Sequence, residues 1–214
     1  MPIKINYKSN VSKQKSLNLV LFVDENFNLS GSKKIISKEE YSYISDLLKN
    51  SDLKKNILSF KINSKKTIYL ISLKKNLKDS DLENLGAKFF DLVKDEKQSD
   101  YSINSEFKYK AINDFIGYFI HGLKLKSYEF NKYKTKNNKK KNFINVFVNK
   151  DETSLKEKLR FEAIENGTFF ARDLVSEPGN VLHPDEYAKR INSLRKLGLK
   201  INIYDKAKLK KLGM

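Results

Sequence analysis

The stretch that decides the fold is Phe169-Phe170-Ala171-Arg172-Asp173-Leu174-Val175-Ser176-Glu177-Pro178-Gly179-Asn180-Val181-Leu182-His183-Pro184. It predicts the end of one helix, a rigid turn and the start of a second helix. Pro178 disfavours a helical backbone at Glu177, so the first helix is expected to end there. Pro184 suits the first turn of the next helix, and the acids Asp185 and Glu186 favour a helix N-terminus. This stretch is therefore expected to join two bodies.

A long helix is predicted upstream of this turn. Its apolar residues recur at roughly helical spacing, and they are Leu155, Leu159, Ala163, Phe170 and Leu174. Ser154 and Glu157 have the spacing of a capping box, which places the helix start near Ser154. We expect the helix, over about 154–175, to act as a linker.

The junction resembles that of the leucyl aminopeptidase (cytosol aminopeptidase) family, in which the pattern is close to Arg-x-Leu-Val-Asn-x-Pro-x-Asn-x-Leu-Thr-Pro. The matching residues are Arg172, Leu174, Val175, Pro178, Asn180, Leu182 and Pro184. Ser176 stands where Asn is usual and His183 where Thr is usual. Histidine is a poorer N-cap than threonine, so the second helix is expected to be weakly capped.

Two further segments carry the same resemblance. Gly122-Leu123 followed by Tyr128–Lys136 is similar to a Gly-Leu…Tyr-x-Phe-x-x-Tyr-Lys segment of the family. Leu197–Leu199 and the residues up to Met214 are similar to the strand and helix that follow the junction. The first hundred residues match only in general layout.

The composition limits the classes of protein to which the chain could belong. The chain has 214 residues, of which 39% are hydrophobic and 12% aromatic, enough for one domain and part of another. It has no apolar run of about 18 residues and no apolar signal core at Met1–Ile5, so neither a membrane span nor a secretory signal is predicted. The absence of cysteine excludes disulfides, thiolate catalysis and Cys-ligated zinc. These features fit a cytoplasmic protein.

The formal net charge of +17 raises the possibility of a nucleic-acid partner. Only four of the 43 basic residues are arginines, so the excess is almost all lysine. A phosphate-binding surface more often uses the arginine fork. We therefore favour an AT-rich coding bias over a selected ligand as the origin of the charge.

Strands interleaved with helices predict an α/β domain over residues 1–150, with a mixed sheet flanked by helices. The expected strands are Ile3–Tyr7, Leu17–Val23, Ile57–Ile62, Thr67–Leu73, Tyr128–Tyr133 and Phe143–Val148. The expected helices run from Ser37 to about Lys49, from Ser80 to about Val93 and over about Tyr109–Leu123. Leu17–Val23 is almost continuously apolar, which is typical of a central strand covered on both faces.

Residues 151–176 form the predicted linker helix, and residues 177–214 are predicted to begin a second α/β domain. Its expected elements are a helix over Pro184–Leu197, a strand over Lys200–Tyr204 and a helix over Lys206–Leu212. These elements are too few to close a core. We therefore expect residues 177–214 to be the truncated start of a larger domain.

Few residues are candidates for catalysis. His121 follows an apolar helix face and is expected to be a packed or surface side chain, and His183 is expected to be a weak cap. Most carboxylates stand at helix starts or in polar loops, where capping and the helix dipole explain them. No zincin, nucleophile-elbow, dinucleotide-binding or Walker A spacing occurs. We predict no catalytic residue and no metal ligand in this chain.

The most concentrated surface feature is Asn131–Lys150, which has no acidic residue. Its candidate nucleic-acid patch consists of Lys132, Lys134, Lys136, Lys139, Lys140 and Lys141. Such a patch would neutralise phosphates, and its binding would depend strongly on salt. We favour another interpretation, a solvated hairpin loop whose lysines keep two edge strands from aggregating.

The resemblance implies the N-terminal part of a metal-dependent exopeptidase that removes N-terminal amino acids, often leucine, from peptides. It further implies a macrodomain-like N-terminal domain, two divalent metals (zinc, manganese or magnesium) in the full-length enzyme, and a cytoplasmic homohexamer. The family's metal and catalytic motifs have no match in this sequence, so no such residue is carried over. The chain alone is expected to be inactive, to bind no cofactor and to serve structure and oligomer contacts. ADP-ribose binding would rest on fold alone and is not predicted.

Two alternatives stay open from the sequence. The chain could be a basic accessory module that binds nucleic acid through Lys132–Lys141, without a membrane partner. It could also be a truncated, catalytically inactive paralogue kept for assembly. Phosphate binding should collapse between about 50 and 200 mM salt, whereas peptidase activity should follow added metal.

Overall fold

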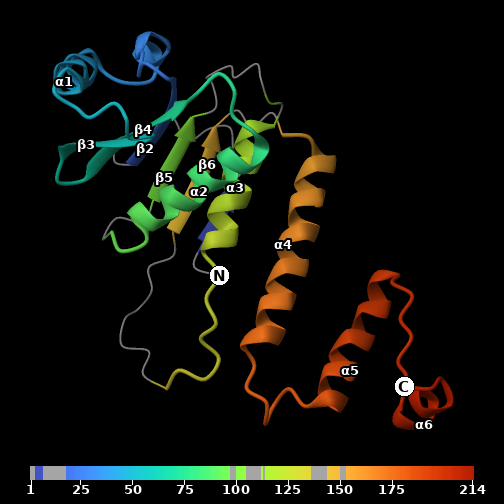
Figure 1. Cartoon of the computed structure of the whole chain (residues 1–214). Helices are drawn as coiled ribbons and strands as arrows, with labels where there is room; N and C mark the ends of the chain where they lie inside the picture. Colours follow the sequence, from blue (N-terminus) through green and yellow to red (C-terminus); the bar gives the residue numbers. More distant parts are fainter. Residues whose placement is uncertain are drawn as a thin grey trace. The chain divides into compact units, whose positions relative to one another are not determined.

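The computed structural model describes residues 3–6, 18–96, 100–104, 112, 114–135, 144–149 and 153–214. The chain divides into two compact units, Met1–Asn166 and Gly167–Met214. The first unit is a layered α/β body, and the second consists of helices and connecting loops (Figure 1). Among the described helices, none combines the length and the apolar character needed to cross a membrane.

A six-stranded mixed sheet forms the centre of the first unit. Across the sheet the strands are β1 (Ile3–Asn6), β6 (Ile144–Asn149), β5 (Asp100–Asn104), β2 (Asn18–Asp24), β4 (Lys66–Leu73) and β3 (Ile57–Asn63). Neighbouring strands are parallel except β3 and β4, which form the predicted hairpin. The predicted fold class, an α/β domain with a mixed sheet flanked by helices, is confirmed.

β2 occupies the middle of the sheet because its sequence is apolar on both faces. Six of its seven residues are buried. Val20 and Phe22 belong to the core on one face, and Leu19, Leu21 and Val23 belong to the core on the other. Parallel strands are usually covered on both faces, and the prediction of a doubly covered central strand is confirmed.

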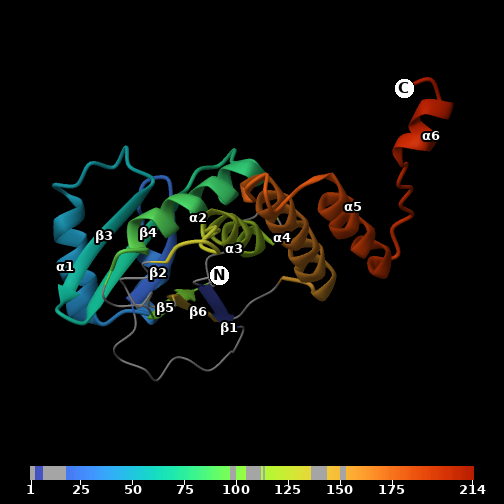
Figure 2. The same cartoon turned by 90° about the horizontal axis from the view of Figure 1, so that it is seen from below.

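Helices cover both faces of the sheet (Figures 1 and 2). On one face lie α1 (Lys38–Leu48) and the short 3₁₀ segment η1 (Ser30–Lys34), and Ile44 of α1 is fully buried there. On the other face lie α2 (Asp79–Val93) and α3 (Phe115–Lys126), which contribute most of the helical residues of the larger core. The two cores account for the layered architecture.

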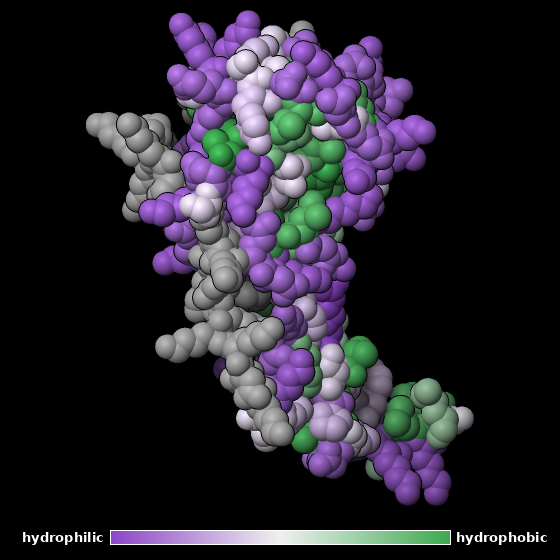
Figure 3. Space-filling model, turned by 90° about the vertical axis from the view of Figure 1, so that its left-hand side faces the viewer, coloured by the Kyte–Doolittle hydropathy of each residue, from purple (hydrophilic) through white to green (hydrophobic). Residues whose placement is uncertain are grey.

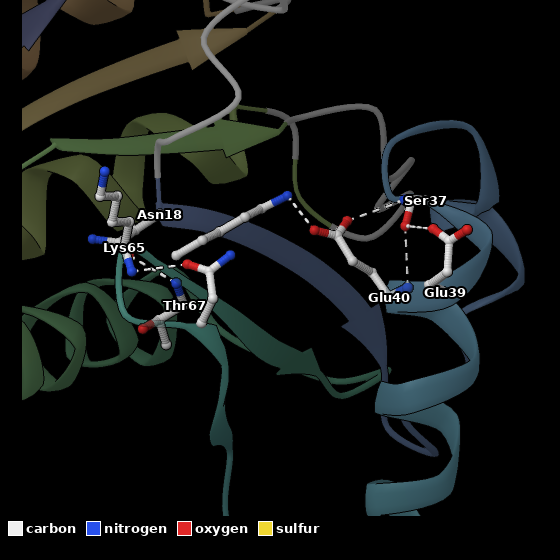
Figure 4. A network of polar contacts seen from close by, with 8 residues as sticks. Asn18, Ser37, Glu39, Glu40, Lys65 and Thr67 are labelled. Carbon is white, nitrogen blue, oxygen red and sulfur yellow. Dashed lines mark hydrogen bonds and ion pairs between the residues drawn. The ribbon is translucent and has the colours of Figure 1, made fainter.

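The N-terminus of α1 shows how local sequence fixes an element (Figure 4). The Ser37 hydroxyl accepts a hydrogen bond from the Glu40 N–H at 3.1 Å, and the Glu40 carboxylate accepts one from the Ser37 N–H at 3.1 Å. This is the predicted capping box. Glu40 also pairs with Lys66 of β4 at 2.6 Å, and the two side chains are only 15% and 19% exposed. The cap therefore ties α1 to the hairpin.

α2 and α3 approach closely through two glycines. A Cβ atom on Gly86 would overlap the carbonyl oxygen of Phe119, and one on Gly122 would overlap the carbonyl oxygen of Glu83. Both obstacles are backbone atoms, which cannot rotate away. Neither position could carry a side chain unless the two helices moved apart.

One strand prediction in the first unit was wrong, and one strand was missed. Tyr128–Tyr133 is not a strand but a run of turns and loop after α3. Both edges of β6 are occupied, by β1 and β5, so a hairpin partner from the preceding loop has no free edge. Conversely, β5 was not predicted, because only Tyr101 and Ile103 of its five residues are apolar.

The helix starts show smaller differences from the predictions. α2 begins at Asp79 and not at Ser80, since Asp81 caps it by accepting from the Lys78 N–H at 2.8 Å. α3 begins at Phe115, whereas a start near Tyr109 was predicted. Residues 105–111 and 113 lie outside the described residues.

α4 (Leu155–Ser176) confirms the predicted long helix, and the Ser154 hydroxyl accepts from the Glu157 N–H at 3.2 Å. The second unit continues with α5 (Pro184–Ser193), η2 (Leu194–Leu197) and α6 (Lys206–Lys211). The predicted strand Lys200–Tyr204 is absent, since none of these residues joins a sheet. The described part of the second unit offers this segment no strand to pair with.

Candidate functional site

The turn between α4 and α5 is fixed by backbone hydrogen bonds. The N–H groups of Val181 and Leu182 both donate to the carbonyl oxygen of Pro178, each at 2.9 Å. Pro184 occupies the first turn of α5, as predicted. His183 is the N-cap residue, and its side chain makes no capping hydrogen bond. The prediction of a weak cap is confirmed.

A charge cluster closes this turn within the second unit. Arg190 of α5 donates from Nε to Glu186 Oε1 at 3.0 Å and from Nη1 to Glu177 Oε1 at 2.9 Å. The Glu177 side chain is only 2% exposed. The hydrogen bond from Arg190 lowers the pKa of Glu186, and the two carboxylates raise the pKa of Arg190. Arg190 thus holds the end of α4 against α5.

Many large apolar residues of the second unit are exposed, although Phe169 and Leu174 are buried. Its exposed residues, which we call the C-terminal apolar surface, are Val175, Tyr187, Leu197, Leu199, Ile203, Tyr204, Leu212 and Met214, each at least 46% exposed. None of α5, η2 and α6 contains a buried residue. Hydrophobic side chains are visible at the lower end of the molecule as well as on the α/β unit (Figure 3). This unit therefore carries the apolar residues of a packed element, but most of them are not buried.

In the first unit, a buried carboxylate joins α3 to α4. His121 Nδ1 lies 3.0 Å from Glu165 Oε1, and Lys124 Nζ donates to Glu165 Oε2 at 2.9 Å. His121 and Glu165 are each 3% exposed, and the Phe161 ring lies 5.0 Å from the imidazole. Both carboxylate oxygens are engaged, so the cluster anchors a helix. His121 is a packed side chain, one of the two roles that the sequence favoured.

A metal site needs several His, Asp or Glu side chains that converge on one point. Within the described residues, no three His, Asp or Glu side chains come close enough together to hold a metal ion. The carboxylates with resolved roles act as caps or ion-pair partners, as Asp81 and Glu165 do.

The candidate nucleic-acid patch is described only in part. Lys132 and Lys134 lie in the turns after α3, where the Lys132 ammonium sits 5.6 Å from the centre of the Tyr133 ring. Tyr133 is 47% exposed. The other four lysines of the patch, Lys136, Lys139, Lys140 and Lys141, lie outside the described residues.

Sequence reasoning missed both charge clusters. The i,i+4 spacing of Glu186 and Arg190 is a signal that could have revealed half of the first one. Glu165 and His121 are 44 positions apart, and no local pattern connects them. Such a contact is visible only once α4 is placed along α3.

The curated proteins to which the chain is similar in sequence share one name. A relative from Bradyrhizobium sp. is 39% identical over 97 residues, which cover 44% of this chain and 19% of that protein. One from Afipia carboxidovorans is 41% identical over 97 residues with the same coverage, and one from Alkaliphilus metalliredigens is 41% identical over 101 residues, covering 44% and 20%. All three are called "Probable cytosol aminopeptidase". No protein-family profile matches the chain.

Solved structures share the fold. A mutant of tomato leucine aminopeptidase superposes with a TM-score of 0.71 at 16% identity, over 99% of this chain and 46% of that one. The bottromycin maturation enzyme BotP in complex with Mn superposes with a TM-score of 0.60 at 14% identity, over 92% and 40%.

The described residues share their fold with part of tomato leucine aminopeptidase and part of BotP. The sequence comparison points to one kind of protein. Over the matched segment, the chain is related to the cytosol (leucyl) aminopeptidases, as the residues of the junction predicted. The matched segment spans about a fifth of the length of the curated relatives, so the activity of a whole enzyme is a matter for proposal.

Proposed function

We propose that the chain is the N-terminal portion of a leucyl-aminopeptidase-like metallo-exopeptidase, which removes N-terminal amino acids from peptides. In this proposal the first unit is a macrodomain-like accessory domain, α4 is the linker and residues 177–214 begin the catalytic domain. The chain then contributes structure and assembly contacts, and the metal site is built by catalytic-domain residues beyond those present here.

The observation that carries this proposal is the C-terminal apolar surface. Leu199, Ile201 and Ile203 alternate with Lys200 and Asn202, which is the pattern of a half-buried strand, yet the segment pairs with nothing described. Burying one large apolar side chain contributes about 1.5–3 kcal/mol. A further domain could pair with this segment as a neighbouring strand and could pack against α5. It would then bury several of these apolar side chains. The rest of an aminopeptidase catalytic domain fits that requirement.

The family relationship extends the proposal to metals, assembly and location. The whole enzyme would use two divalent ions (zinc, manganese or magnesium), and BotP, which shares the fold, was solved with Mn. It would form a homohexamer in the cytoplasm, in keeping with the relatives' name of cytosol aminopeptidase. Its substrates would be peptides, and it would have no membrane partner.

The first test is the intact mass of the native gene product from source cells, followed by an assay of leucine release from a peptide with and without Mn²⁺ or Zn²⁺. We expect a product roughly twice the 25.0 kDa of this chain, with metal-dependent peptidase activity. The 214-residue chain assayed alone should be inactive. A native product of 25.0 kDa would overturn the peptidase proposal for this chain and favour an inactive paralogue kept for assembly.

A second candidate function, nucleic-acid binding, is favoured by one observation. Tyr133 is an exposed aromatic ring beside Lys132 and Lys134, and stacking rings among lysines are typical of single-strand binding surfaces. Anisotropy with a fluorescent single strand tests it, comparing Lys132→Glu/Lys134→Glu with the control Lys49→Glu/Lys54→Glu. Binding by the unmodified chain that falls by about 10³-fold from 50 to 200 mM salt, and that is weakened by the first pair of substitutions and not by the control pair, would support it.

A further inference from the structure

A pocket of about 670 Å³ opens in the first unit at the carboxyl ends of β2 and β4. Its wall is formed by the residues that follow β4, among them Lys74 and Lys75, and by Asn84 and Lys88 from α2. Leu85 gives it an apolar floor that continues into the larger core. We call this the carboxyl-edge pocket. Its volume lies in the range of sites for small molecules.

The topology of the sheet explains why a hollow forms there. From β2 the chain moves outward to β3 and β4, and from β4 it crosses over β2 to reach β5. α1 follows β2 on one face, and α2 follows β4 on the other. The connections after β2 and β4 therefore leave the carboxyl edge towards opposite faces of the sheet. In open α/β sheets, ligands bind in crevices outside the carboxyl ends of the strands.

The polar groups of the pocket are unevenly charged. Three lysines, Lys74, Lys75 and Lys88, face two carboxylates. Asp81 already accepts from the Lys78 N–H at 2.8 Å, and Glu25 lies 3.7 Å from Lys75. Within the described part of the chain, no carboxylate forms an ion pair with Lys88. The lining of the pocket thus carries three positive side chains and two negative ones, and Lys88 is the cation on which the charge argument rests.

Neutral donors complete the lining of the pocket. Asn56, Asn76 and Asn84 bring side-chain amides to it. Amide N–H groups and lysine ammonium groups are donors that suit a phosphate, with lysine acting as a point charge. The sequence has no glycine-rich phosphate loop, so any phosphate would be held here by side chains and not by a cradle of backbone N–H groups.

We propose that the carboxyl-edge pocket binds a small phosphorylated molecule, with Lys88 and Lys74 as its main anchors. The lysine-rich composition alone would spread cations evenly over the surface. The pocket differs from that background because its cations border an open hollow with an apolar floor. This site lies in the accessory unit and does not depend on peptidase activity, so either proposal can fail without the other.

Pyrophosphate is the probe for the test, added to the ¹⁵N-labelled 214-residue chain at about 50 mM salt. Amide shifts should concentrate at 72–77 and on the side of α2 that carries Asn84 and Lys88. Lys74→Gln/Lys88→Gln should weaken binding at least fivefold, whereas the control Lys34→Gln/Lys49→Gln, on η1 and at the end of α1, should not. All four lysines are exposed, so these changes should leave the fold intact, which circular dichroism checks.

Three results would overturn the proposal. The first is a set of shifts spread over lysines throughout the surface. The second is an equal loss of affinity in the two double variants, which would show general attraction to a cationic protein. The third is acetate binding as tightly as pyrophosphate, which would show that the pocket does not select a phosphate. Filling the hollow with Asn84→Trp should abolish the localised shifts, and their survival would also contradict the proposal.

Discussion

The two units of this chain treat their apolar residues in opposite ways. The first buries large side chains such as Phe89 and Phe119 completely, in cores on both faces of a sheet. In the second, Leu197 is 76% exposed and Met214 is 84% exposed. The hydrophobic effect acts equally on both, so the difference lies in what each unit has to pack against. The first unit has a complete core. Much of the apolar surface of the second unit lacks other residues to pack against.

α4 carries covered and exposed side chains along its whole length. Phe161 packs against the Tyr118 ring at 5.0 Å, and Glu165 binds two partners on α3. Leu155 is 73% exposed near the start of the helix, and Val175 is 87% exposed near its end. Within the first unit, α4 is therefore anchored through one face. Measurements of stability on single variants can test how much each kind of contact contributes.

The largest effect is expected from truncation in the first core. Phe89→Ala should lower the free energy of unfolding by about 3–5 kcal/mol, because it opens a cavity among fully buried rings. Leu197→Ala, in the second unit, should change it by less than about 0.5 kcal/mol. Urea denaturation of both variants tests the comparison. A large cost for Leu197→Ala in the 214-residue chain would mean that the second unit has a packed core after all.

The second-largest loss of stability is expected from a substitution where α2 and α3 cross. Gly122→Ala should destabilise by about 3 kcal/mol, the upper end of the usual overpacking range, since the new methyl group meets a backbone oxygen. Gly167→Ala in α4 is the control, because nothing lies within 4 Å of a Cβ there. That change should stabilise by about 0.5–1 kcal/mol through helix propensity. Equal midpoints for the two variants would contradict the close approach.

The buried carboxylate should have a smaller effect. Glu165→Ala should cost about 1–3 kcal/mol, as it removes the hydrogen-bond partner of the buried His121. Lys124 is 22% exposed and can turn to water, which limits the loss. Glu162→Ala, at an exposed position of α4, provides a comparison. Thermal melts that show the same loss for both would mean that α4 is not anchored through α3.

The smallest expected effect is a change in the free energy of unfolding at alkaline pH. Burial raises the pKa of Tyr69, whose hydroxyl also donates to Glu96 at 2.8 Å, and burial likewise raises the pKa of Tyr101. In the unfolded chain both phenols ionise near pH 10. Their contribution to stability is therefore fully present below about pH 10 and is lost as the pH rises above it. Tyr69→Phe/Tyr101→Phe should flatten the decline measured by urea titration at pH 9–11, and an unchanged slope would refute it.

The features that the sequence predicted are those decided by neighbouring residues. The Ser37–Glu40 capping box, the apolar run of β2 and the two prolines around the α4–α5 turn each act over a few positions. The loop Tyr128–Tyr133 was misjudged because a strand also needs a free edge, and which edges are free depends on the whole sheet order. β5 was missed because only two of its five residues are apolar. The carboxyl-edge pocket also depends on the order of the strands, because it lies at the ends of β2 and β4. No local sequence motif could therefore indicate it.

The unpaired segment 199–203 also bears on how this chain behaves at high concentration. An alternating apolar segment that joins no sheet can pair with copies of itself as an added strand. Lys200 within the segment and the lysines on both sides of it, together with a net charge of +17, keep the copies apart. That repulsion has a range of about 10 Å at 0.1 M salt and about 3 Å at 1 M. Colloidal stability of the isolated chain is therefore electrostatic, and dilute buffer is the condition that preserves the monomer.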